Sequence, residues 1–404
     1  MSSGKVEHEL SRGEEISIIN LIDCLIEHAF VINASDIHID PNEHCVKVRL
    51  RIDGMLYDVY SLPKNIYEEV ISRIKVMAGL RTDEHQSPQD GRFRNSISPN
   101  AKVDVRVSIV PTYHGENAVL RLLRDVREDY TFDLLGFNAL DQQKILKALR
   151  KPHGMILATG PTGSGKTTTL YTMIKHLNTR DMSVVTIEDP IEYSIEGVEQ
   201  IQVNHHKGLN FANGLRSVLR QDPNVIMVGE IRDVETASLA INTALTGHLL
   251  LSTLHTNDAA TILPRLVDMR VEPYLVASTI NIAVAQRLVR KICSACKREK
   301  VLTESERFGL IDALRDAGVE INDKFYRGFG CDECVGTGYK GRVSVNEVMV
   351  ADASIKDAIL RRATAREIKK IAMEHGMTSM MDDGMSKASA GITTVDEILR
   401  VIYE

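Results

Sequence analysis

The residues best suited to chemistry form one continuous stretch, Gly160-Pro161-Thr162-Gly163-Ser164-Gly165-Lys166-Thr167, which fits the pattern GxxxxGK[ST] in full. Its three glycines allow successive backbone N–H groups to turn toward one phosphate, and the helix that follows offers its positive N-terminal end. Lys166 would reach the β- and γ-phosphates, and the Thr167 hydroxyl would hold Mg²⁺. The residues from Gly160 to Thr168 are therefore predicted to bind a nucleotide together with Mg²⁺.

The surroundings separate this stretch from an ordinary glycine-rich turn. The apolar run Met155 to Ala158 comes before it, and a helical pattern from Thr168 to Leu177 follows it. A phosphate-binding loop requires strand, loop and helix in this order. ATP is favoured over GTP, because the sequence lacks the TKxD or NKxD signature of guanine-specific proteins.

Polar clusters follow the other apolar runs in this half of the chain. Strand-like runs of four to six residues alternate with helical patterns, which indicates a parallel, doubly wound sheet. Ligands of such sheets bind at the carboxyl ends of the strands. At these ends the sequence places Glu188-Asp189-Pro190-Ile191-Glu192, Gly229-Glu230-Ile231-Arg232-Asp233 and His255.

These polar residues match the needs of an ATPase. Such an enzyme needs a carboxylate that activates water, a metal near the β- and γ-oxygens and a group that senses the γ-phosphate. Glu188, Glu230 and His255 suit those roles. Gly229 stands where an aspartate commonly holds magnesium, so we expect Glu188 to supply that charge and Glu230 to act as the base. Taken singly, the acidic residues through Glu192 could be a solvated loop and His255 a structural histidine.

The N-terminal third has the pattern of an α+β domain. A capping box of Ser11 and Glu14 predicts that a helix begins there and continues to Val31. Alternating strand patterns follow, and Asp53-Gly54 and Asp90-Gly91 are both signals of hairpin turns.

Two arginines on strands of this domain are candidates for a phosphate contact. Arg106 lies in the alternating run Val103 to Ile109, and Arg121 lies in the apolar run Asn117 to Arg124. A strand holds a guanidinium stiffly enough to meet a phosphate at a fixed distance. Most strand arginines face water, so solvated or ion-paired arginines explain the spacing at least as well.

The six cysteines include two CxxC pairs, Cys293-x-x-Cys296 and Cys331-x-x-Cys334. Four thiolates suffice for one closed tetrahedral Zn²⁺ site, which we expect to be structural. A reduced thiol cluster without metal is the alternative. The segment Lys297 to Gly330 is expected to form a loop with its own short helix, and the short helical patterns beyond Val350 predict a small helical bundle.

Composition and length limit the class of protein. The chain has 404 residues, of which 43% are hydrophobic and 26% charged, and this length suggests two or three domains. A formal net charge of -6 gives no global attraction to nucleic acid or acidic lipid. Because Met1 to Glu15 contain no apolar signal core and no run of eighteen apolar residues occurs, we expect a soluble, cytoplasmic protein.

Taken together, these motifs resemble the secretion ATPases of type II secretion and type IV pilus assembly, over nearly the whole chain. The phosphate loop is one part of the resemblance. The others are Ala34-Ser35-Asp36-Ile37-His38-Ile39, Arg51-Ile52-Asp53-Gly54, Gln89-Asp90-Gly91-Arg92, Glu188 to Glu192 as the family's Asp box, Gly229 to Asp233 as its Walker B and Gly247 to Asn257 as its His box.

The resemblance implies a homo-hexameric ring at the cytoplasmic face of the bacterial inner membrane. There, Mg²⁺-dependent hydrolysis of ATP to ADP and phosphate would move an inner-membrane platform protein. Other components of the machinery and an acidic lipid surface are implied partners, and nucleic acid is not expected. Family members usually carry a further N-terminal domain that binds an inner-membrane partner. This chain begins almost at the helix before Ala34, which is consistent with a truncated piece; recruitment of such a fragment to the membrane should be impaired even when its ring chemistry is intact.

The resemblance also implies roles for residues outside the phosphate loop. Arg106 and Arg121 match the positions from which the family's N-terminal domain reaches the γ-phosphate. The paired CxxC units match the zinc-bearing loop of assembly ATPases, which retraction ATPases lack, so extension or secretion is favoured. The expected catalytic residues are Lys166, Glu188, Glu192, Glu230, His255, Arg106 and Arg121, and the expected zinc ligands are Cys293, Cys296, Cys331 and Cys334.

The expected fold class is α/β. We expect an N-terminal α+β (PAS-like) domain over residues 1–129, a RecA-like P-loop doubly wound domain over 130–290, a tetracysteine zinc-binding module over 291–345 and a C-terminal helical subdomain over 346–404. Two other functions stay open at this point. One is a nucleic-acid translocase with a similar motor fold, and the other is a scaffold that binds ATP without hydrolysing it.

Overall fold

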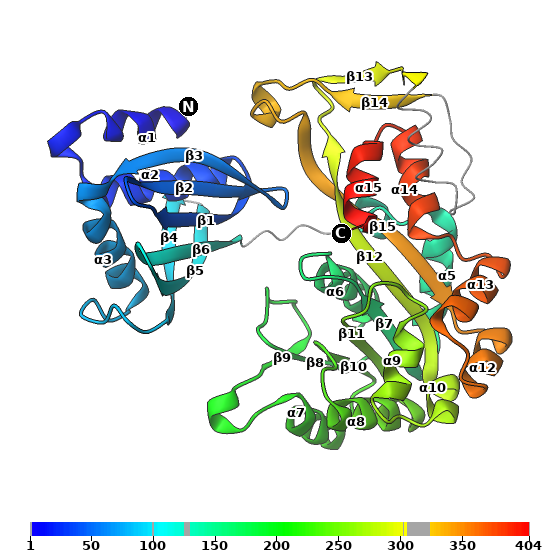
Figure 1. The fold of residues 1–404 in the computed structure, drawn as a ribbon. Coiled ribbons are helices and arrows are strands. Elements are labelled where there is room, and N and C mark those ends of the chain that lie inside the picture. Colours follow the sequence, from blue (N-terminus) through cyan, green and yellow to red (C-terminus); the bar gives the residue numbers. More distant parts are fainter. Residues whose placement is uncertain (1, 99–100, 125–129, 302, 305–323, 404) are drawn as a thin grey trace. The chain divides into compact units, whose positions relative to one another are not determined.

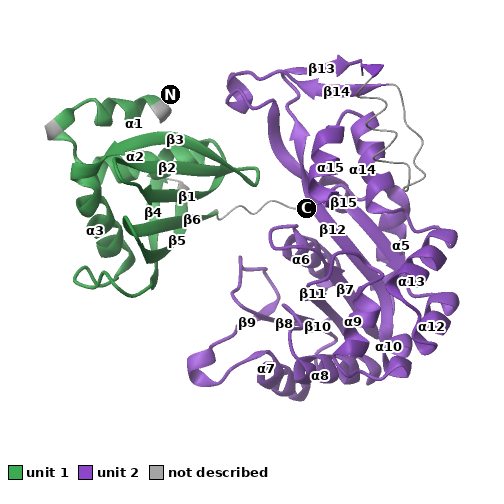
Figure 2. Cartoon of the chain, viewed as in Figure 1, with its two compact units in different colours: residues 1–128 green, residues 129–404 purple. Residues whose placement is uncertain are grey.

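The chain divides into two compact units, unit 1 from Met1 to Glu128 and unit 2 from Asp129 to Glu404 (Figure 2). The division lies beside the boundary expected at residue 129. Each unit has its own hydrophobic core, as a chain of this length requires. The computed structural model describes residues 2–98, 101–124, 130–301, 303–304 and 324–403.

Unit 1 is built on an antiparallel sheet with the strand order β3-β2-β1-β6-β5-β4 (Figure 1). Alternate residues of β5 are buried from Val103 to Ile109, whereas Asp104 and Arg106 lie on the half-buried opposite face. One face of the sheet therefore forms the core. The strands are β1 (Ala34–Pro41), β2 (Cys45–Ile52), β3 (Met55–Pro63), β4 (Gln89–Ser98), β5 (Ala101–Thr112) and β6 (Gly115–Arg124).

The helices of unit 1 are α1 (Ser2–Leu10), α2 (Ile18–Val31) and α3 (Tyr67–Ala78), and α2 and α3 pack their apolar faces on the sheet. The predicted start of α2 is wrong. Ser17 caps this helix by accepting the N–H of Asn20, whereas the hydroxyl of Ser11 donates to the carbonyl of His8 at 2.7 Å. Because Ser11 closes α1, its hydroxyl is not available to start α2.

One of the two predicted hairpin turns is confirmed. Asp53-Gly54 joins β2 to β3 with φ angles of +49° and +90°, and both central residues of such a two-residue turn must have positive φ. Asp90-Gly91 instead lies within β4 and pairs with β5. A Cβ atom at Gly91 would lie 2.7 Å from the carbonyl oxygen of Ala78. This glycine therefore permits the close approach of α3 to β4 rather than a turn.

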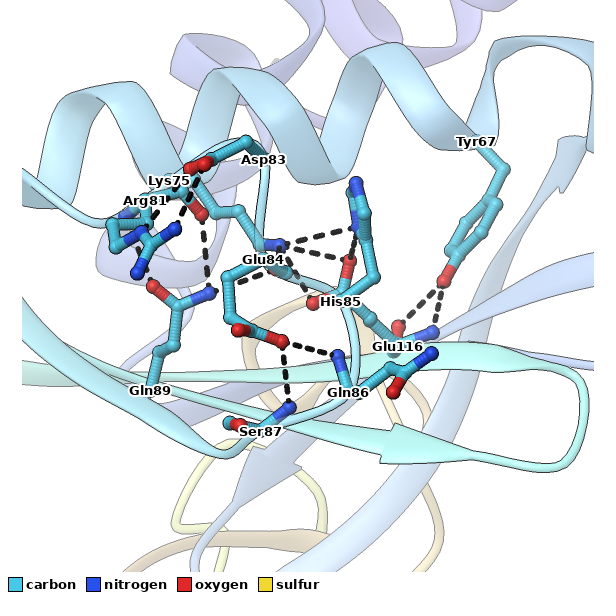
Figure 3. A network of polar contacts seen from close by, with 10 residues as sticks. All are labelled: Tyr67, Lys75, Arg81, Asp83, Glu84, His85, Gln86, Ser87, Gln89 and Glu116. Atoms are coloured by element: carbon cyan, nitrogen blue, oxygen red, sulfur yellow. Dashed lines mark hydrogen bonds and ion pairs between the residues drawn. The ribbon is translucent and has the colours of Figure 1, made fainter.

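A buried ion pair ties α3 to the sheet of unit 1 (Figure 3). Lys75 is fully buried, and its ammonium nitrogen lies 2.7 Å from Oε1 of Glu116 on β6. Nδ1 of His85 lies 2.8 Å from the other oxygen of Glu116, and Lys75 also donates to the carbonyl of Glu84 at 2.6 Å. The loop between α3 and β4 is thereby fixed to both the helix and the strand.

Unit 2 is built on a sheet with the strand order β15-β12-β7-β11-β10-β8-β9 (Figure 1). Neighbouring strands run parallel from β12 to β9, and β15 is antiparallel to β12. The strand-like apolar runs that the sequence predicts at 156–159, 184–187, 225–228 and 249–254 are confirmed as β7, β8, β10 and β11. The strands are β7 (Gly154–Thr159), β8 (Val184–Glu188), β9 (Glu199–Gln202), β10 (Val225–Val228), β11 (Leu249–Leu254), β12 (Ile280–Ile292) and β15 (Tyr339–Val350).

Helices cover both faces of this sheet. Met155 and Leu157 of β7 belong to one hydrophobic core, and Ile156 and Ala158 belong to another on the opposite face. The α/β fold is thus confirmed. The helices are α4 (Phe132–Leu135), α5 (Ala139–Leu149), α6 (Lys166–Leu177), α7 (Phe211–Val218), α8 (Val234–Leu245), α9 (Ile262–Asp268), α10 (Pro273–Thr279), α12 (Ala353–Leu360), α13 (Ala365–Glu374), α14 (Met380–Ser389) and α15 (Val395–Tyr403).

The tetracysteine region and the C-terminal helices share this sheet rather than standing apart from it. The expected boundaries at residues 290 and 345 fall inside β12 and β15. The short helices predicted beyond Val350 are present as α12 to α15, and Ile398 of α15 packs in one core with Val289 of β12 and Val345 of β15. A small two-stranded sheet of β13 (Lys297–Lys300) and β14 (Phe325–Gly328) extends from this region.

Two remaining predictions concern single helices. The short helix expected between the CxxC pairs falls largely on residues 305–323, which lie outside the described residues. Among the residues that the structure describes, no helix has both the length and the apolar character needed to span a membrane.

Candidate active site

The phosphate loop joins β7 to α6, which begins at Lys166. Gly160, Gly163 and Gly165 have φ angles of +139°, +79° and +88°, a region that a side chain would strain. Nζ of Lys166 donates to the carbonyl oxygens of Gly160 at 2.8 Å and Pro161 at 3.0 Å. The loop therefore curls around its own lysine.

Lys166 is buried, and the charge of one carboxylate acts on it. Burial lowers the pKa of Lys166, and the negative charge of Glu230 acts in the opposite direction. Glu230 follows β10 in the chain, one strand removed from β7 in the sheet. The sheet thus brings the predicted carboxylate within electrostatic range of the predicted phosphate-binding lysine.

Glu230 and His255 meet at the carboxyl ends of two neighbouring strands. Nε2 of His255, which follows β11, lies 3.1 Å from Oε2 of Glu230. Nε of Arg232 lies 2.6 Å from the same oxygen. A carboxylate with an imidazole beside it can orient a water molecule and pass on a proton, which is the chemistry that hydrolysis of a phosphoanhydride needs.

Glu188 lies in the interior, at the end of β8. Its Oε1 accepts the hydroxyl of Thr186 at 2.5 Å and the side-chain amide of Gln200 at 3.1 Å. Its Oε2 accepts the hydroxyl of Tyr171 on α6. Burial raises the pKa of Tyr171, and the charge of Glu188 raises it further. The carboxylate is therefore fixed by donors from α6, β8 and β9.

Tyr171, Thr186 and Gln200 were not among the residues predicted from the sequence. Tyr171 is fully buried on α6, and a buried tyrosine hydroxyl requires a partner. A tyrosine at this place in the helix could therefore have indicated that a hydrogen-bond acceptor packs against α6. It could not have indicated that the acceptor is Glu188.

The rest of the acidic segment after β8 behaves differently from Glu188. Glu192 is exposed at the surface, and Oδ2 of Asp189 lies 3.2 Å from Nε2 of His205. Packing explains the glycine at position 229, because a Cβ atom there would lie 3.2 Å from the carbonyl oxygen of Ile187. Of the predicted carboxylates, Glu188 is therefore buried, Glu230 pairs with His255 and Arg232, and Glu192 lies at the surface.

Arg106 and Arg121 lie opposite each other on β5 and β6 of unit 1. Arg92 of β4 continues this row on one side, and Asp36 of β1 continues it on the other. Nε of Arg121 donates to Oδ1 of Asp36 at 2.8 Å, although 61% of the Arg121 side chain is exposed. Arg51 of β2 also pairs with Asp36, and its Nε lies 3.5 Å from Oδ2, so this carboxylate has guanidinium groups on both of its neighbouring strands. Arg92 was part of the Gln89-Asp90-Gly91-Arg92 motif quoted from the sequence, but it was not predicted as a site residue because it follows the supposed turn at Asp90-Gly91.

The four cysteines of the CxxC pairs come together, and their sulfur atoms all lie within 4.8 Å of one another. The Sγ atoms of Cys293 and Cys331 are 3.8 Å apart, as are those of Cys296 and Cys334. Burial raises the pKa of Cys334, but N–H donors of Cys331 and Gly338 outweigh it and bring the value to about 7. The cluster therefore has the composition and spacing of a metal site, as predicted.

Comparison with known proteins places these motifs in a family. The family described as Type II/IV secretion system protein matches residues 12–400. The chain is 48% identical to type II secretion system protein E of Xanthomonas campestris, over 99% of this chain and 70% of that protein. It is 46% identical to the type IV pilus assembly ATPase PilB of Thermus thermophilus, over 96% of this chain and 43% of that protein.

Solved structures agree with these relatives. The pilus retraction motor PilT, solved with bound ADP, aligns with a TM-score of 0.62 at 26% identity, over 94% of this chain and 96% of that one. Because the matched residues run through both units and include the phosphate loop and the cysteine cluster, the chain belongs to the Type II/IV secretion system protein family.

Proposed function

We propose that this protein is a Mg²⁺-dependent motor that hydrolyses ATP to ADP and phosphate and powers type IV pilus assembly or type II protein secretion. The observation that carries the proposal is the phosphate loop around Lys166 with Glu230 and His255 beside it. Relatives named as a type II secretion protein and as a pilus assembly ATPase support the same reading of the site.

The residues of unit 2 divide the work of hydrolysis. Lys166 would exchange the carbonyl oxygens of its own loop for the β- and γ-phosphate oxygens. Glu230 orients and deprotonates the attacking water, and His255 senses the γ-phosphate through its contact with Glu230. Mg²⁺, when bound, neutralises charge on the β- and γ-oxygens. The Thr167 hydroxyl and the charge of Glu188 fit Mg²⁺, because this ion prefers oxygen ligands.

Arg106 and Arg121 would complete the site from unit 1 by reaching the γ-phosphate when the two domains close. The exposure of Arg121 supports this role, because a residue that meets a phosphate outside its own domain must be accessible. Hydrolysis would then depend on domain closure, and closure would transmit force. Glu192, at the surface, would add a further carboxylate at the rim of the site.

The motor would act as a homo-hexamer at the cytoplasmic face of the inner membrane and move a platform protein there. We assign the cysteine cluster to structural Zn²⁺. A tetrahedron with Zn–S bonds of about 2.3 Å has edges of about 3.8 Å, which matches the sulfur separations. A zinc-bearing loop favours assembly or secretion over pilus retraction.

Two substitutions test the site. Lys166→Ala should abolish phosphate release because the β- and γ-phosphates lose their cation. Glu230→Ala should abolish it as well but should still bind ATP, since the phosphate loop stays intact. Phosphate release and the binding of a fluorescent ATP analogue are measured on each purified variant. Near-wild-type turnover by either variant would refute the site assignment.

The partner can be tested by stimulation of the wild-type protein. Steady-state phosphate release is measured alone, with single-stranded DNA, and with the cytoplasmic part of a platform protein plus acidic lipid. We expect stimulation by the platform protein and lipid. Stimulation by DNA alone would indicate a translocase, and bound ATP without turnover under any condition would indicate a scaffold.

A further inference from the structure

Gln286 on β12 is a buried amide beside the phosphate loop. It follows Ala285, which makes the last pair between β12 and β7 opposite Thr159. The chain leaves β7 for the phosphate loop at this point, so Gln286 lies where the sheet ends and the loop begins. Only 1% of its surface is exposed. A buried amide needs partners for both its oxygen and its nitrogen.

Both partners of Gln286 belong to the nucleotide-binding segment. Nε2 of Gln286 donates to the carbonyl oxygen of Ser164 at 2.9 Å, and Oε1 accepts the hydroxyl of Thr169 on α6 at 2.8 Å. The orientation of the amide is fixed, because a backbone carbonyl can only accept and so must face the nitrogen. Gln286 therefore bridges the loop and the second turn of the helix that follows it.

The bond to Ser164 also orients the next N–H group. The carbonyl of Ser164 and the N–H of Gly165 belong to one trans peptide unit, in which the two groups point in opposite directions. Because Gln286 holds the carbonyl toward β12, the N–H of Gly165 points away from β12. Backbone N–H groups at this place in a phosphate loop are the donors that hold the phosphates.

Two glycines of the loop are fitted to this contact. A Cβ atom at Gly165 would lie 2.9 Å from Nε2 of Gln286. A Cβ atom at Gly160 would lie 2.3 Å from the backbone oxygen of the same glutamine. Larger residues at either position would push the loop away from β12. Gln286 can therefore approach the loop this closely only because both positions are glycine.

We propose that Gln286 is a positioning residue, which sets the direction of the Gly165 N–H group in the phosphate loop through the carbonyl of Ser164. The inference rests on the proposed ATPase function. Gln286 does not touch the nucleotide in this scheme. Its loss should therefore loosen ATP binding without removing any group that takes part in the chemical step.

The same strand offers a matched control. Asn281 is 7% exposed; its Nδ2 donates to the carbonyl of His153 at 2.9 Å, and its Oδ1 accepts from Lys151 at 3.0 Å. It is therefore also a buried amide that bridges a backbone carbonyl and a side chain, but at the opposite end of the pairing with β7. Replacing each amide by an apolar group of similar size makes the same kind of change at the two sites.

The experiment compares Gln286→Met with Asn281→Leu in the full chain. We measure the Kd for a fluorescent ATP analogue with Mg²⁺, KM and kcat for phosphate release, and the Tm without nucleotide. Gln286→Met should raise Kd and KM about tenfold, as expected for two lost hydrogen bonds, and should change kcat less than KM. Asn281→Leu should lower Tm to a similar degree and leave Kd within about twofold of wild type. Equal Kd values for the two variants would overturn the proposal.

If Gln286→Met does not fold, a second pair of variants tests whether the Gln286 amide affects ATP binding. Thr169→Val removes the donor that holds the Gln286 amide, whereas Thr172→Val removes only a bond to Thr168 within α6. Thr169→Val should raise Kd about threefold and Thr172→Val should not. No difference between them would overturn the inference. Failure of the wild-type protein to bind Mg²⁺-ATP would refute both the proposed function and this inference. Normal binding by the wild type, together with an unchanged Kd in Gln286→Met, would refute the inference alone.

Discussion

Two buried carboxyl groups of unit 2, those of Glu347 and Glu397, have pKa values shifted in opposite directions because their neighbours differ. Burial raises the pKa of Glu347, which pairs with Lys369 at 3.2 Å. Burial also raises the pKa of Glu397, but hydrogen bonds from Arg290 and Arg400 outweigh it and lower the value to about 2. Two guanidinium groups thus reverse the effect that burial has on a carboxyl group.

The position of Glu397 predicts a loss of stability in acid. Since its folded pKa lies below the ordinary 4.5, its contribution is complete above pH 4.5 and is lost as the pH falls toward 2. Between pH 7 and pH 3 the free energy of unfolding of unit 2 should fall by about 2 kcal/mol more in the wild type than in Glu397→Gln. Urea denaturation at the two pH values measures this. Equal losses in both proteins would contradict the assignment.

At the scale of elements, β12 joins the parts of unit 2 that act together. It pairs with β7 on one side and with β15 on the other. Gln286 of this strand contacts the phosphate loop, and Arg287, the next residue, donates to the carbonyl of Val401 on α15. The strand ends at Ile292, one residue before Cys293 of the cysteine cluster. The phosphate loop, the C-terminal helix and the cysteine cluster are therefore all joined to one strand.

This arrangement predicts what loss of the metal does. Native protein should contain one Zn²⁺ per chain, and Cys331→Ser should lose it, because the remaining three thiolates leave the tetrahedron open. The region of β13 and β14 should lose its structure, while the phosphate loop, anchored in the main sheet, should still bind ATP. Metal analysis, hydrogen exchange and nucleotide titration test this. Native protein without metal would remove the zinc assignment.

At the scale of the whole molecule, the charged groups suited to ATP hydrolysis are divided between two units. Unit 2 has Lys166, Glu230 and His255, and unit 1 has the arginine row on the sheet face opposite its core. Under the proposed function, a site that required groups from both units would couple each hydrolysis to a movement.

Substitutions in unit 1 test this dependence. Arg121→Ala and Arg106→Ala should lower kcat by about a hundredfold, because an arginine at the γ-phosphate stabilises the transition state. Binding of ATP should change little, since the phosphate loop is in unit 2. Arg81→Ala is the control, because Arg81 is an exposed arginine of the same unit that pairs with Asp83. Unchanged kcat in both test variants would remove the arginines from the mechanism.

Features that depend only on residues close together in the chain could be predicted from the sequence. The phosphate loop, the parallel strands of buried apolar runs and the two CxxC pairs each depend on short-range spacing, and the structure contains all of them. Asp53-Gly54 is a correct turn for the same reason, because a short turn is decided by the φ angles of its own residues. The pairing of Glu230 with His255 followed from the rule that parallel strands end at one edge of the sheet.

Other features were decided only by tertiary packing. Asp90-Gly91 has the composition of a turn but pairs with β5. Its glycine is needed because α3 approaches β4 closely at this position, and not because the chain bends there. Gln286 and Arg287 interrupt the apolar pattern of β12 because they contact the phosphate loop and α15. Ser164 and Gln286 are 122 residues apart in sequence, so the bond between them depends on how distant strands pair. Local spacing determined which groups could do chemistry, and long-range packing decided what holds them in place.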